Sequence, residues 1–262
     1  MAKKARVTRF SGAYWSDQIK DITVVGAGGI GSWLALNLAR IGHNIFLIDD
    51  DRVDETNVTG GQMFMKKHIN SYKVDCVSSI CYEFGSGERS RIFPITARYE
   101  ESSDLTQICI SALDNMETRK KLFNDWLKLQ EDGNNEEPYI FIDGRLTMEM
   151  FEIFAIQGGD AEAAKMYSKD YLFDDAESNA LDCTTKQSTF SAMGIASFIT
   201  ATLCNYLSNA KMGASIREVP FYQRIYMPTF EQRVICSSSE SRIAAKVVEG
   251  VPEESEVADE EK

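Results

Sequence analysis

A glycine-rich segment near the amino terminus is the strongest chemical signal in the sequence. Gly26, Gly28, Gly29 and Gly31 directly follow the largely apolar run Asp21–Val25 and open a stretch with helical periodicity. Glycines here permit a tight turn and let a phosphate approach the backbone, while the helix start supplies free N–H groups and a positive dipole end. The segment therefore predicts a nucleotide site between a strand and a helix.

An acidic side chain follows where the sugar of such a nucleotide would lie. Asp49 ends the second expected strand, 23 positions after Gly26, and a carboxylate there can accept the ribose hydroxyls. A nicotinamide-dependent oxidoreductase would satisfy this pattern equally well. It would also need an acid or base at the hydride site. The sequence places none, since His43 and His68 lack a partner nearby in sequence.

The residues after Asp49 separate these two interpretations. The segment Leu47–Val58 holds the acidic run Asp49-Asp50-Asp51 and then Thr56-Asn57-Val58. It resembles the signature of the ubiquitin-activating and ThiF/MoeB/HesA enzymes, in which a D-x-D element precedes a Ser/Thr-Asn-Leu/Val element. Three further pieces arrive in the order of that superfamily, and these are Lys73, Asp114-Asn115 and Arg119.

The resemblance implies an ATP-dependent adenylyltransferase that activates a carboxylate. Asp49 would then bind the ribose, Asn57 and Lys73 would contact the triphosphate, and Asp114 would hold Mg²⁺ and orient the α-phosphate. The nucleotide-contacting set also includes the four glycines, Asp51 and Asn115. A carboxylate that attacks a phosphorus atom needs cations to screen the repulsion between the anions, and such a set supplies them.

Each of these residues also has a structural interpretation. Lys73 can be a solvated helix residue, Asp114 a helix cap, and Arg119 the partner of a surface carboxylate. Taken in their order along the chain, however, the residues favour the adenylyltransferase.

The chain departs from the superfamily pattern at one position. Gly60-Gly61 stands where an Arg-Gln pair usually follows the asparagine, and that arginine normally touches the phosphates. Gln62 could replace it in part. A catalytically weakened member that binds nucleotide or serves as a heterodimer partner is the alternative. Arg9 resembles the arginine of an arm that reaches the partner subunit's ATP site, which implies a homodimer; a basic amino terminus without a role is the other interpretation.

The acceptor implied by the resemblance is the terminal carboxylate of a ubiquitin-like protein, a sulfur-carrier protein or a peptide. The segment from about 158 to 187 is polar and aperiodic, as expected for the crossover loop that covers its path. Cys183 lies there, either as a thioester nucleophile or as a structural cysteine before a helix. Arg145 either contacts the acceptor carboxylate or pairs with Asp143 or Asp182. Four other cysteines fall within expected helices or strands and should only pack, namely Cys76, Cys81, Cys109 and Cys204.

Strand and helix patterns alternate along most of the chain. Expected strands at 21–25, 44–48, 92–97, 107–111, 139–143 and 148–157 are interleaved with expected helices at 29–41, 72–84, 116–130 and 189–210, and 219–235 alternates as paired strands would. This predicts an α/β fold, a Rossmann-like, doubly wound and mostly parallel sheet with a C-terminal antiparallel extension. We expect an N-terminal arm at 1–20, one ThiF-like adenylation domain at 21–247 and a disordered acidic tail at 248–262.

Composition narrows the functional class further. The net charge of -12 argues against a general nucleic-acid binder. No apolar run approaches the roughly 20 residues of a membrane span, and no signal-peptide core follows the first residues, so we expect a cytoplasmic protein without membrane contact. The six cysteines form no C-x-x-C pair, so zinc is not expected.

Overall fold

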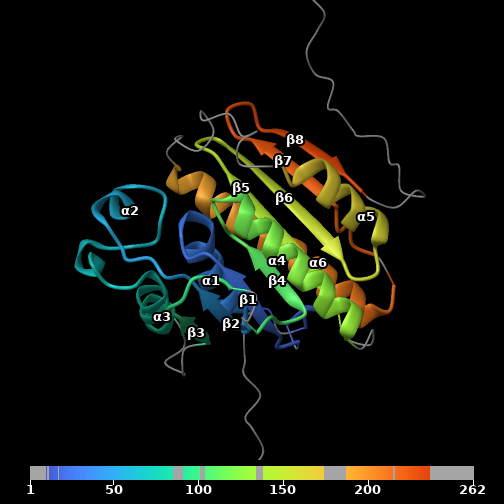
Figure 1. Cartoon of the computed structure of the whole chain (residues 1–262), viewed down its shortest axis with the longest axis horizontal. Helices are drawn as coiled ribbons and strands as arrows, with labels where there is room; N and C mark the ends of the chain where they lie inside the picture. Colours follow the sequence, from blue (N-terminus) through green and yellow to red (C-terminus); the bar gives the residue numbers. More distant parts are fainter. Residues whose placement is uncertain are drawn as a thin grey trace, which may run out of the picture.

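The strands of the protein form a single eight-stranded sheet (Figure 1). The computed structural model describes residues 10, 12–16, 18–84, 91–100, 104–133, 138–173, 187–214 and 216–236. In chain order the strands are β1 (Asp21–Val25), β2 (Asn44–Ile48), β3 (Ile92–Ile95), β4 (Ile108–Ser111), β5 (Ile140–Leu146), β6 (Met150–Gln157), β7 (Tyr222–Tyr226) and β8 (Glu231–Ile235). Across the sheet their order is β3-β2-β1-β4-β5-β6-β7-β8.

The sheet changes character at β5. Strands β3, β2, β1, β4 and β5 are parallel, whereas β6, β7 and β8 pair antiparallel. The chain leaves β1 toward β2 on one side and returns to β4 on the other, so a topological switch point lies between β1 and β4. Ligands of open α/β sheets bind at such a point, beyond the carboxyl ends of the strands. The expected fold class is confirmed.

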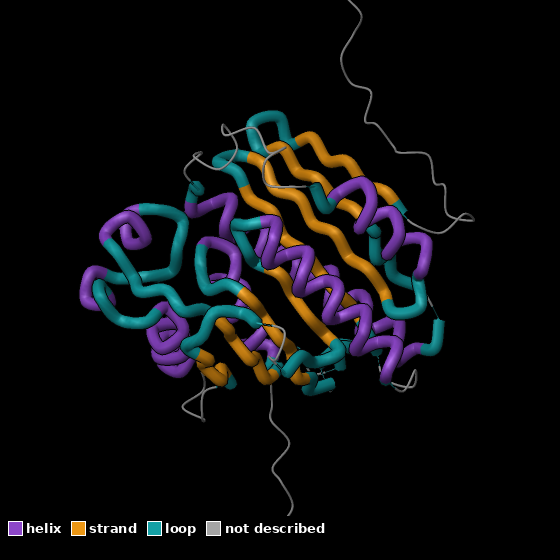
Figure 2. Tube along the Cα trace, viewed as in Figure 1, coloured by secondary structure: helices purple, strands orange, loops and turns teal. Residues whose placement is uncertain are grey.

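Helices cover both faces of the sheet (Figure 2). In chain order they are α1 (Gly29–Ile41), α2 (Glu55–Thr59), the 3₁₀ turn η1 (Lys66–His68), α3 (Lys73–Phe84), α4 (Met116–Asp132), α5 (Ala161–Met166), the π-helical turn η2 (Tyr167–Tyr171) and α6 (Thr189–Met212). The buried side chains of α1, α3 and α6 join one core cluster, and those of α4, α5 and η2 join the other.

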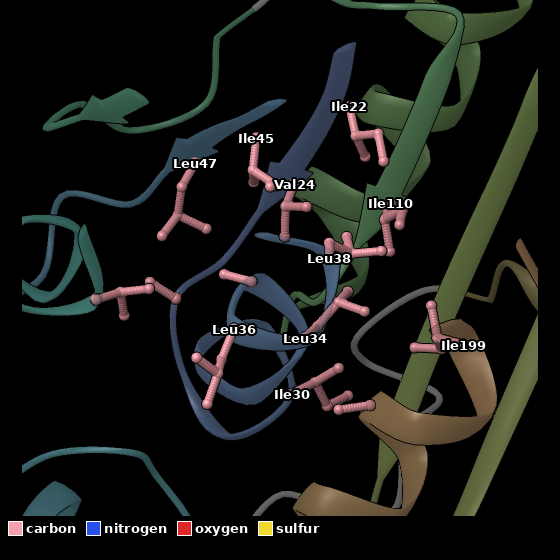
Figure 3. Close-up of a cluster of buried hydrophobic side chains, with 14 of the residues drawn as sticks. Ile22, Val24, Ile30, Leu34, Leu36, Leu38, Ile45, Leu47, Ile110 and Ile199 are labelled. Atoms are coloured by element: carbon pink, nitrogen blue, oxygen red, sulfur yellow. The ribbon is translucent and has the colours of Figure 1, made fainter. Parts of the chain in front are cut away.

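Successive side chains along each strand point to opposite faces of the sheet and so contribute to the two core clusters in turn. Ile22 and Val24 of β1 belong to the cluster under α1 and α6, whereas Val25 belongs to the cluster under α4. Leu34 and Leu38, on the inner face of α1, complete the first cluster (Figure 3). Parallel strands that are buried on both faces have nearly continuous apolar sequences. This is why residues 21–25 could be predicted as a strand.

Most element boundaries agree with the sequence expectation, and the differences are local. The segment 158–187 is not irregular throughout, because α5 and η2 form within it. Asp160 starts α5 by accepting a hydrogen bond from the Ala163 N–H at 2.9 Å. The short helix α2 was also not expected. Arg9, Cys183 and the acidic tail lie outside the described residues.

Helix α6 ends two residues beyond the expected helix at 189–210. Its 24 residues reach the length and hydropathy of a membrane-crossing helix, which corrects the expectation that no segment approaches a span. Half of its most apolar window is buried within the protein. That buried side packs on α1, β5 and β6, and a core helix meets the same length and hydropathy criterion.

The four cysteines assigned to packing are buried, as expected. Burial raises the pKa of the Cys81 thiol to about 12 and that of Cys204 to about 11, and it raises the pKa of Cys109 as well. A thiol is nucleophilic as its thiolate, so these side chains are inert near neutral pH. Cys76, whose pKa burial also raises, belongs with them.

A buried histidine closes the turn between α1 and β2. His43 follows the left-handed Gly42 at the end of α1, and its Nδ1 accepts a hydrogen bond from the Lys20 N–H at 3.2 Å. Only 1% of the residue is exposed, and its Nε2 has no hydrogen-bond partner among the described residues. Burial, with the nearby charges of Arg91 and Lys20, lowers the pKa of His43 to about 4.

This shift predicts an acid-dependent loss of stability. Between its unfolded pKa near 6.5 and the folded value of about 4, the unfolded state binds a proton that the folded state does not, so the free energy of unfolding falls as pH falls. The full effect is about 3 kcal/mol. Urea unfolding at pH 7 and at pH 4.5 should show this slope in the wild type and a smaller one in His43→Asn. Equal slopes in the two proteins would contradict the assignment.

Candidate functional site

The turn after β1 lies against the loop after β4. Gly26 has φ +100°, and a side chain there would place its first carbon 2.5 Å from the carbonyl oxygen of Ala112. A side chain at Gly31 would overlap the carbonyl of Gly26. Because only glycine fits both positions, the start of α1 comes close to the segment that leads to Asp114. The glycines of this segment are therefore required by the close packing of the turn after β1 against the loop after β4.

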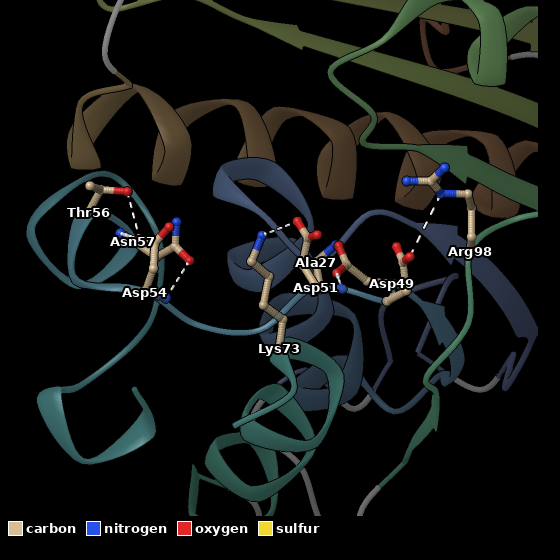
Figure 4. A network of polar contacts seen from close by, with 9 residues as sticks. Ala27, Asp49, Asp51, Asp54, Thr56, Asn57, Lys73 and Arg98 are labelled. Atoms are coloured by element: carbon tan, nitrogen blue, oxygen red, sulfur yellow. Dashed lines mark hydrogen bonds and ion pairs between the residues drawn. The ribbon is translucent and has the colours of Figure 1, made fainter. Parts of the chain in front are cut away.

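Asp49 holds this glycine turn in place. One carboxylate oxygen accepts a hydrogen bond from the Ala27 N–H at 2.7 Å, and the other accepts from the Asp51 N–H at 2.8 Å (Figure 4). Burial raises the pKa of Asp49, although these hydrogen bonds and the charge of Lys73 oppose the shift. Asp49 lies at the expected edge of the sheet and has a structural task there in addition to the ribose contact expected of it.

Lys73 is paired with Asp51 across the end of β2. Its Nζ lies 2.7 Å from Asp51 Oδ2, and its backbone N–H donates to the Asp51 carbonyl at 2.9 Å. An isolated bridge between Arg52 and Tyr72 aligns the two segments. Only 9% of the lysine side chain is exposed, against 65% of the aspartate side chain. Lys73 is therefore not a solvated helix residue, and its charge is held at the carboxyl edge of the sheet.

Asn57 is positioned by the cap of α2. Asp54 accepts hydrogen bonds from the Asn57 N–H at 2.8 Å and from the Thr56 hydroxyl at 2.6 Å, while the Asn57 side-chain oxygen accepts from the Asp54 N–H at 3.0 Å (Figure 4). These hydrogen bonds lower the pKa of Asp54. The capping box uses the oxygen of the Asn57 amide and leaves its nitrogen able to donate.

Asp114 and Asn115 divide their tasks at the end of β4. Asn115 caps α4, because its side-chain oxygen accepts from the Thr118 N–H at 2.8 Å. Asp114 is exposed and does not take part in the cap, so the interpretation of Asp114 as a helix cap is wrong. A carboxylate oxygen is a ligand that Mg²⁺ accepts, and Mg²⁺ commonly uses one or two protein carboxylates together with phosphate oxygens. Asp114 fits that requirement, although no group of three ligating side chains occurs among the described residues.

A buried ion network backs the Asp114 loop. Asp143 is fully buried and accepts from Arg119 Nε at 2.7 Å and from Arg145 Nε at 2.8 Å. Arg119 also donates to the carbonyl of Leu113, the residue before Asp114, at 2.5 Å. Burial alone would raise the pKa of Asp143, but the two guanidinium groups lower it below its usual value. Arg119 therefore pairs with a core carboxylate rather than a surface one.

Arg145 faces the interior of the protein. Its guanidinium donates to the Tyr171 carbonyl at 2.9 Å and lies 4.6 Å above the Phe154 ring. The side chain is 15% exposed. Of the two interpretations of Arg145, the ion pair with Asp143 is confirmed. The contact with an acceptor carboxylate stays a prediction.

The start of α6 also reaches the glycine turn, which the sequence interpretation missed. A side chain at Gly29 would overlap the side chain of Gln187, and one at Gly61 would stand 3.1 Å from the Ser188 carbonyl oxygen. These residues are more than 120 positions apart in the chain. Local sequence carries no signal of this contact, because it depends on how α6 packs against α1.

The fold and the residues at the carboxyl edge of the parallel strands define the class of protein. A doubly wound sheet with a glycine turn at its switch point, next to strand-end carboxylates and a buried lysine, is the arrangement expected for a Rossmann-like nucleotide site. The sequence matches the ThiF family over residues 17–232, and the chain belongs to that family.

Solved structures show the same fold at low sequence identity. PaaA shares 14% identity at a TM-score of 0.62, over 86% of this chain and 66% of its own. Escherichia coli MccB with ATP shares 16% at 0.61, over 86% and 66%. The microcin C7 biosynthetic enzyme MccB, in complex with N-formylated MccA, shares 16% at 0.62, over 86% and 67%. The chain thus spans about two thirds of these proteins. No curated protein matches the sequence.

The ion network leads to a prediction about stability. Asp143→Asn should lower the free energy of unfolding by about 3–5 kcal/mol, because two buried guanidinium groups lose their counter-charge. Asp50→Asn, which alters an exposed carboxylate 3.7 Å from Arg98, should change it by no more than about 0.5 kcal/mol. Urea unfolding of both variants tests the assignment, and similar losses in the two would contradict it.

Proposed function

We propose that this protein is an ATP- and Mg²⁺-dependent adenylyltransferase that activates a terminal carboxylate as an acyl-adenylate. The single observation that carries the proposal is the assembly of Asp49, Asp51, Lys73 and Asp114 around the glycine turn at the switch point of the sheet. An oxidoreductase has no use for Asp114 together with Lys73 at this edge of the sheet. Membership of the ThiF family supports the same reaction class.

Each residue has a task in this reaction. The glycine turn and the start of α1 would take phosphate oxygens, Asp49 and Asp51 lie where the ribose hydroxyls would bind, and Lys73 would offset phosphate charge. Mg²⁺, when bound at Asp114, would supply a Lewis acid that polarises phosphate oxygens. The Asn57 amide nitrogen would donate to the triphosphate.

The chemical step is a displacement at the α-phosphorus. A carboxylate oxygen of the acceptor forms a bond to that phosphorus, and the bond to the bridging oxygen of pyrophosphate breaks. The Arg119–Asp143–Arg145 network would hold the Asp114 loop rigid while charge moves to the leaving group. Residues 1–9 include Arg9, which we propose to act at the site of the second subunit of a homodimer.

The acceptor we propose is the carboxyl terminus of a ubiquitin-like protein, a sulfur-carrier protein or a peptide. MccB, which has the same fold, has been solved with ATP and in complex with N-formylated MccA, and this supports a peptide acceptor. A subsequent thioester on Cys183 and a cytoplasmic location are parts of the proposal that rest on the sequence alone.

A weakened family member that binds nucleotide as a partner protein is the second candidate. Gly60-Gly61, in place of the usual Arg-Gln pair, favours it, because a neutral loop does not offset phosphate charge. This candidate predicts ATP binding without turnover, so the two functions are separated by one experiment.

Pyrophosphate exchange is that experiment. Labelled pyrophosphate should enter ATP in the presence of Mg²⁺ and a panel of acceptors, comprising a ubiquitin-like protein that ends in Gly-Gly and peptides with free carboxyl termini. Asp114→Ala should reduce exchange by about 100-fold, because a charge-stabilising group at the reacting phosphorus is lost. ATP binding is measured by calorimetry on the same samples.

The control for this measurement is Asp104→Ala. Asp104 is an exposed carboxylate before β4, at the opposite end of the strand from Asp114, and its loss should leave exchange unchanged. ATP binding without exchange across the panel would favour the partner protein. Binding of NADH with no binding of ATP would overturn both the adenylyltransferase and the ATP-binding partner protein.

A further inference from the structure

Two arginines lie directly opposite each other at the antiparallel end of the sheet. Arg224 of β7 pairs with Arg233 of β8 in the register of these strands. Side chains at such positions have their first carbons about 5 Å apart, and like charges there are destabilising. Arg224 is half-buried and Arg233 is exposed. The two residues, called here the arginine pair, therefore bring positive charges together in a protein whose net charge is -12.

The arginine pair lacks a counter-charge in the part of the chain that the structure describes. Neither side chain makes an ion pair or a hydrogen bond there. Glu152, opposite Arg224 on β6, instead accepts a hydrogen bond from the Tyr222 hydroxyl. Glu231 is the other carboxylate of strands β6 to β8, and it lies exposed at the start of β8. Two guanidinium groups are thus available to an anion.

The arginine pair lies beyond the part of the sheet face that α5 and η2 cover. Tyr222 and Arg224 occupy alternate positions of β7, so their side chains point to the same face. Tyr171 of η2 stacks on Tyr222, with ring centroids 5.7 Å apart. The hairpin between β7 and β8 extends past α5 at the top of Figure 1. The guanidinium groups therefore face solvent on the side of the sheet that carries α4 and α5.

Protection of the sheet edge explains only one of these arginines. A charged side chain on an edge strand discourages pairing with another chain, and β8 is an edge strand. Arg224, however, lies on the inner strand β7, where it has no edge to protect. A half-buried charge without a partner is costly, so Arg224 in particular points to a bound anion.

The chain itself contains an anionic segment of suitable length and position. The structure describes residues as far as Cys236, three positions after Arg233. Residues 249–261 hold seven carboxylates and no basic side chain. A flexible linker as long as residues 237–248 would span about 20 Å, whereas the path along β8 from Cys236 back to Arg233 is about 10 Å. The acidic segment can therefore reach the arginine pair.

We propose that the acidic segment 249–261 binds intramolecularly to the arginine pair. Its carboxylates accept charge-assisted hydrogen bonds from the two guanidinium groups and offset the repulsion between them. Because the segment is tethered to β8, its effective concentration is about millimolar, so that even weak contacts keep it bound. The contact requires neither nucleotide nor acceptor, and it is independent of the proposed adenylyl transfer.

The test measures the fluorescence anisotropy of a labelled peptide with the sequence of residues 249–261, titrated with full-length protein at low salt. A variant with all seven carboxylates of this segment changed to amides (Glu→Gln, Asp→Asn) has a free arginine pair. It should bind the peptide about tenfold more tightly than the wild type, in which the tethered segment competes. Adding Arg224→Gln or Arg233→Gln to this variant should weaken the peptide about fivefold in each case.

The matched control adds Arg98→Gln to the same variant. Arg98 is an exposed arginine that follows β3, the strand at the opposite edge of the sheet, and its loss should leave peptide binding unchanged. A peptide with amides in place of its carboxylates should not bind. Because Arg233 is exposed on an edge strand, Arg233→Gln tests the arginine pair even if Arg224→Gln lowers the thermal midpoint.

Three results would overturn the proposal. Equal peptide affinity in the wild type and in the amide variant would show that the tethered segment does not occupy the arginine pair, and any binding that still needs both arginines would then assign them to an external acidic partner. Unchanged affinity in both arginine variants would exclude the arginine pair as the site. The third result uses the double variant Arg224→Gln/Arg233→Gln with its acidic segment intact, which should not displace the peptide from an equimolar amount of the amide variant. Displacement would show that the segment binds a second copy instead.

Discussion

The close approach of two turns at the centre of the sheet is the constraint on which the rest of the structure depends. Gly26 adopts a left-handed conformation against Ala112, and Asp49 fastens the turn through the Ala27 N–H. This brings together the ends of β1, β2 and β4, which the chain reaches far apart in sequence. A side chain at Gly26 or Gly31 would push the start of α1 away from the loop of Asp114. The phosphate position and the expected metal ligand would then no longer face the same space.

Charge is distributed unevenly around that space. Exposed carboxylates gather at the strand ends, whereas the basic groups close to them are held by partners, Lys73 by Asp51 and the pair Arg119 and Arg145 by Asp143. Buried ions of this kind contribute little net stability, because desolvation offsets their attraction. Their value here is positional, since Arg119 fixes the carbonyl just before Asp114. A site of this composition suits a ligand that arrives with its own cation.

The contacts of α6 give Gly60-Gly61 a structural role that the sequence does not show. In the sequence, the pair only marks the absence of the usual basic residue. In the structure the glycines accept hydrogen bonds from Trp33 and Thr189 and leave room for Gln187 beside Gly29. The glycine pair is therefore fitted to the residues that lead into α6.

The sequence by itself determined the fold class, nearly all the strands and long helices, and the glycine turn with its following acids, because apolar periodicity and glycine chemistry are local properties. Residues spaced along strand ends, such as Asp49 and Asp114, could be assigned to one edge because parallel strands end together. Only the tertiary structure decided that Asn115 rather than Asp114 caps α4, that Arg119 pairs with Asp143, and that Gln187 meets Gly29. Each of these depends on side-chain direction or helix packing between distant segments, and neither leaves a periodic trace in the chain.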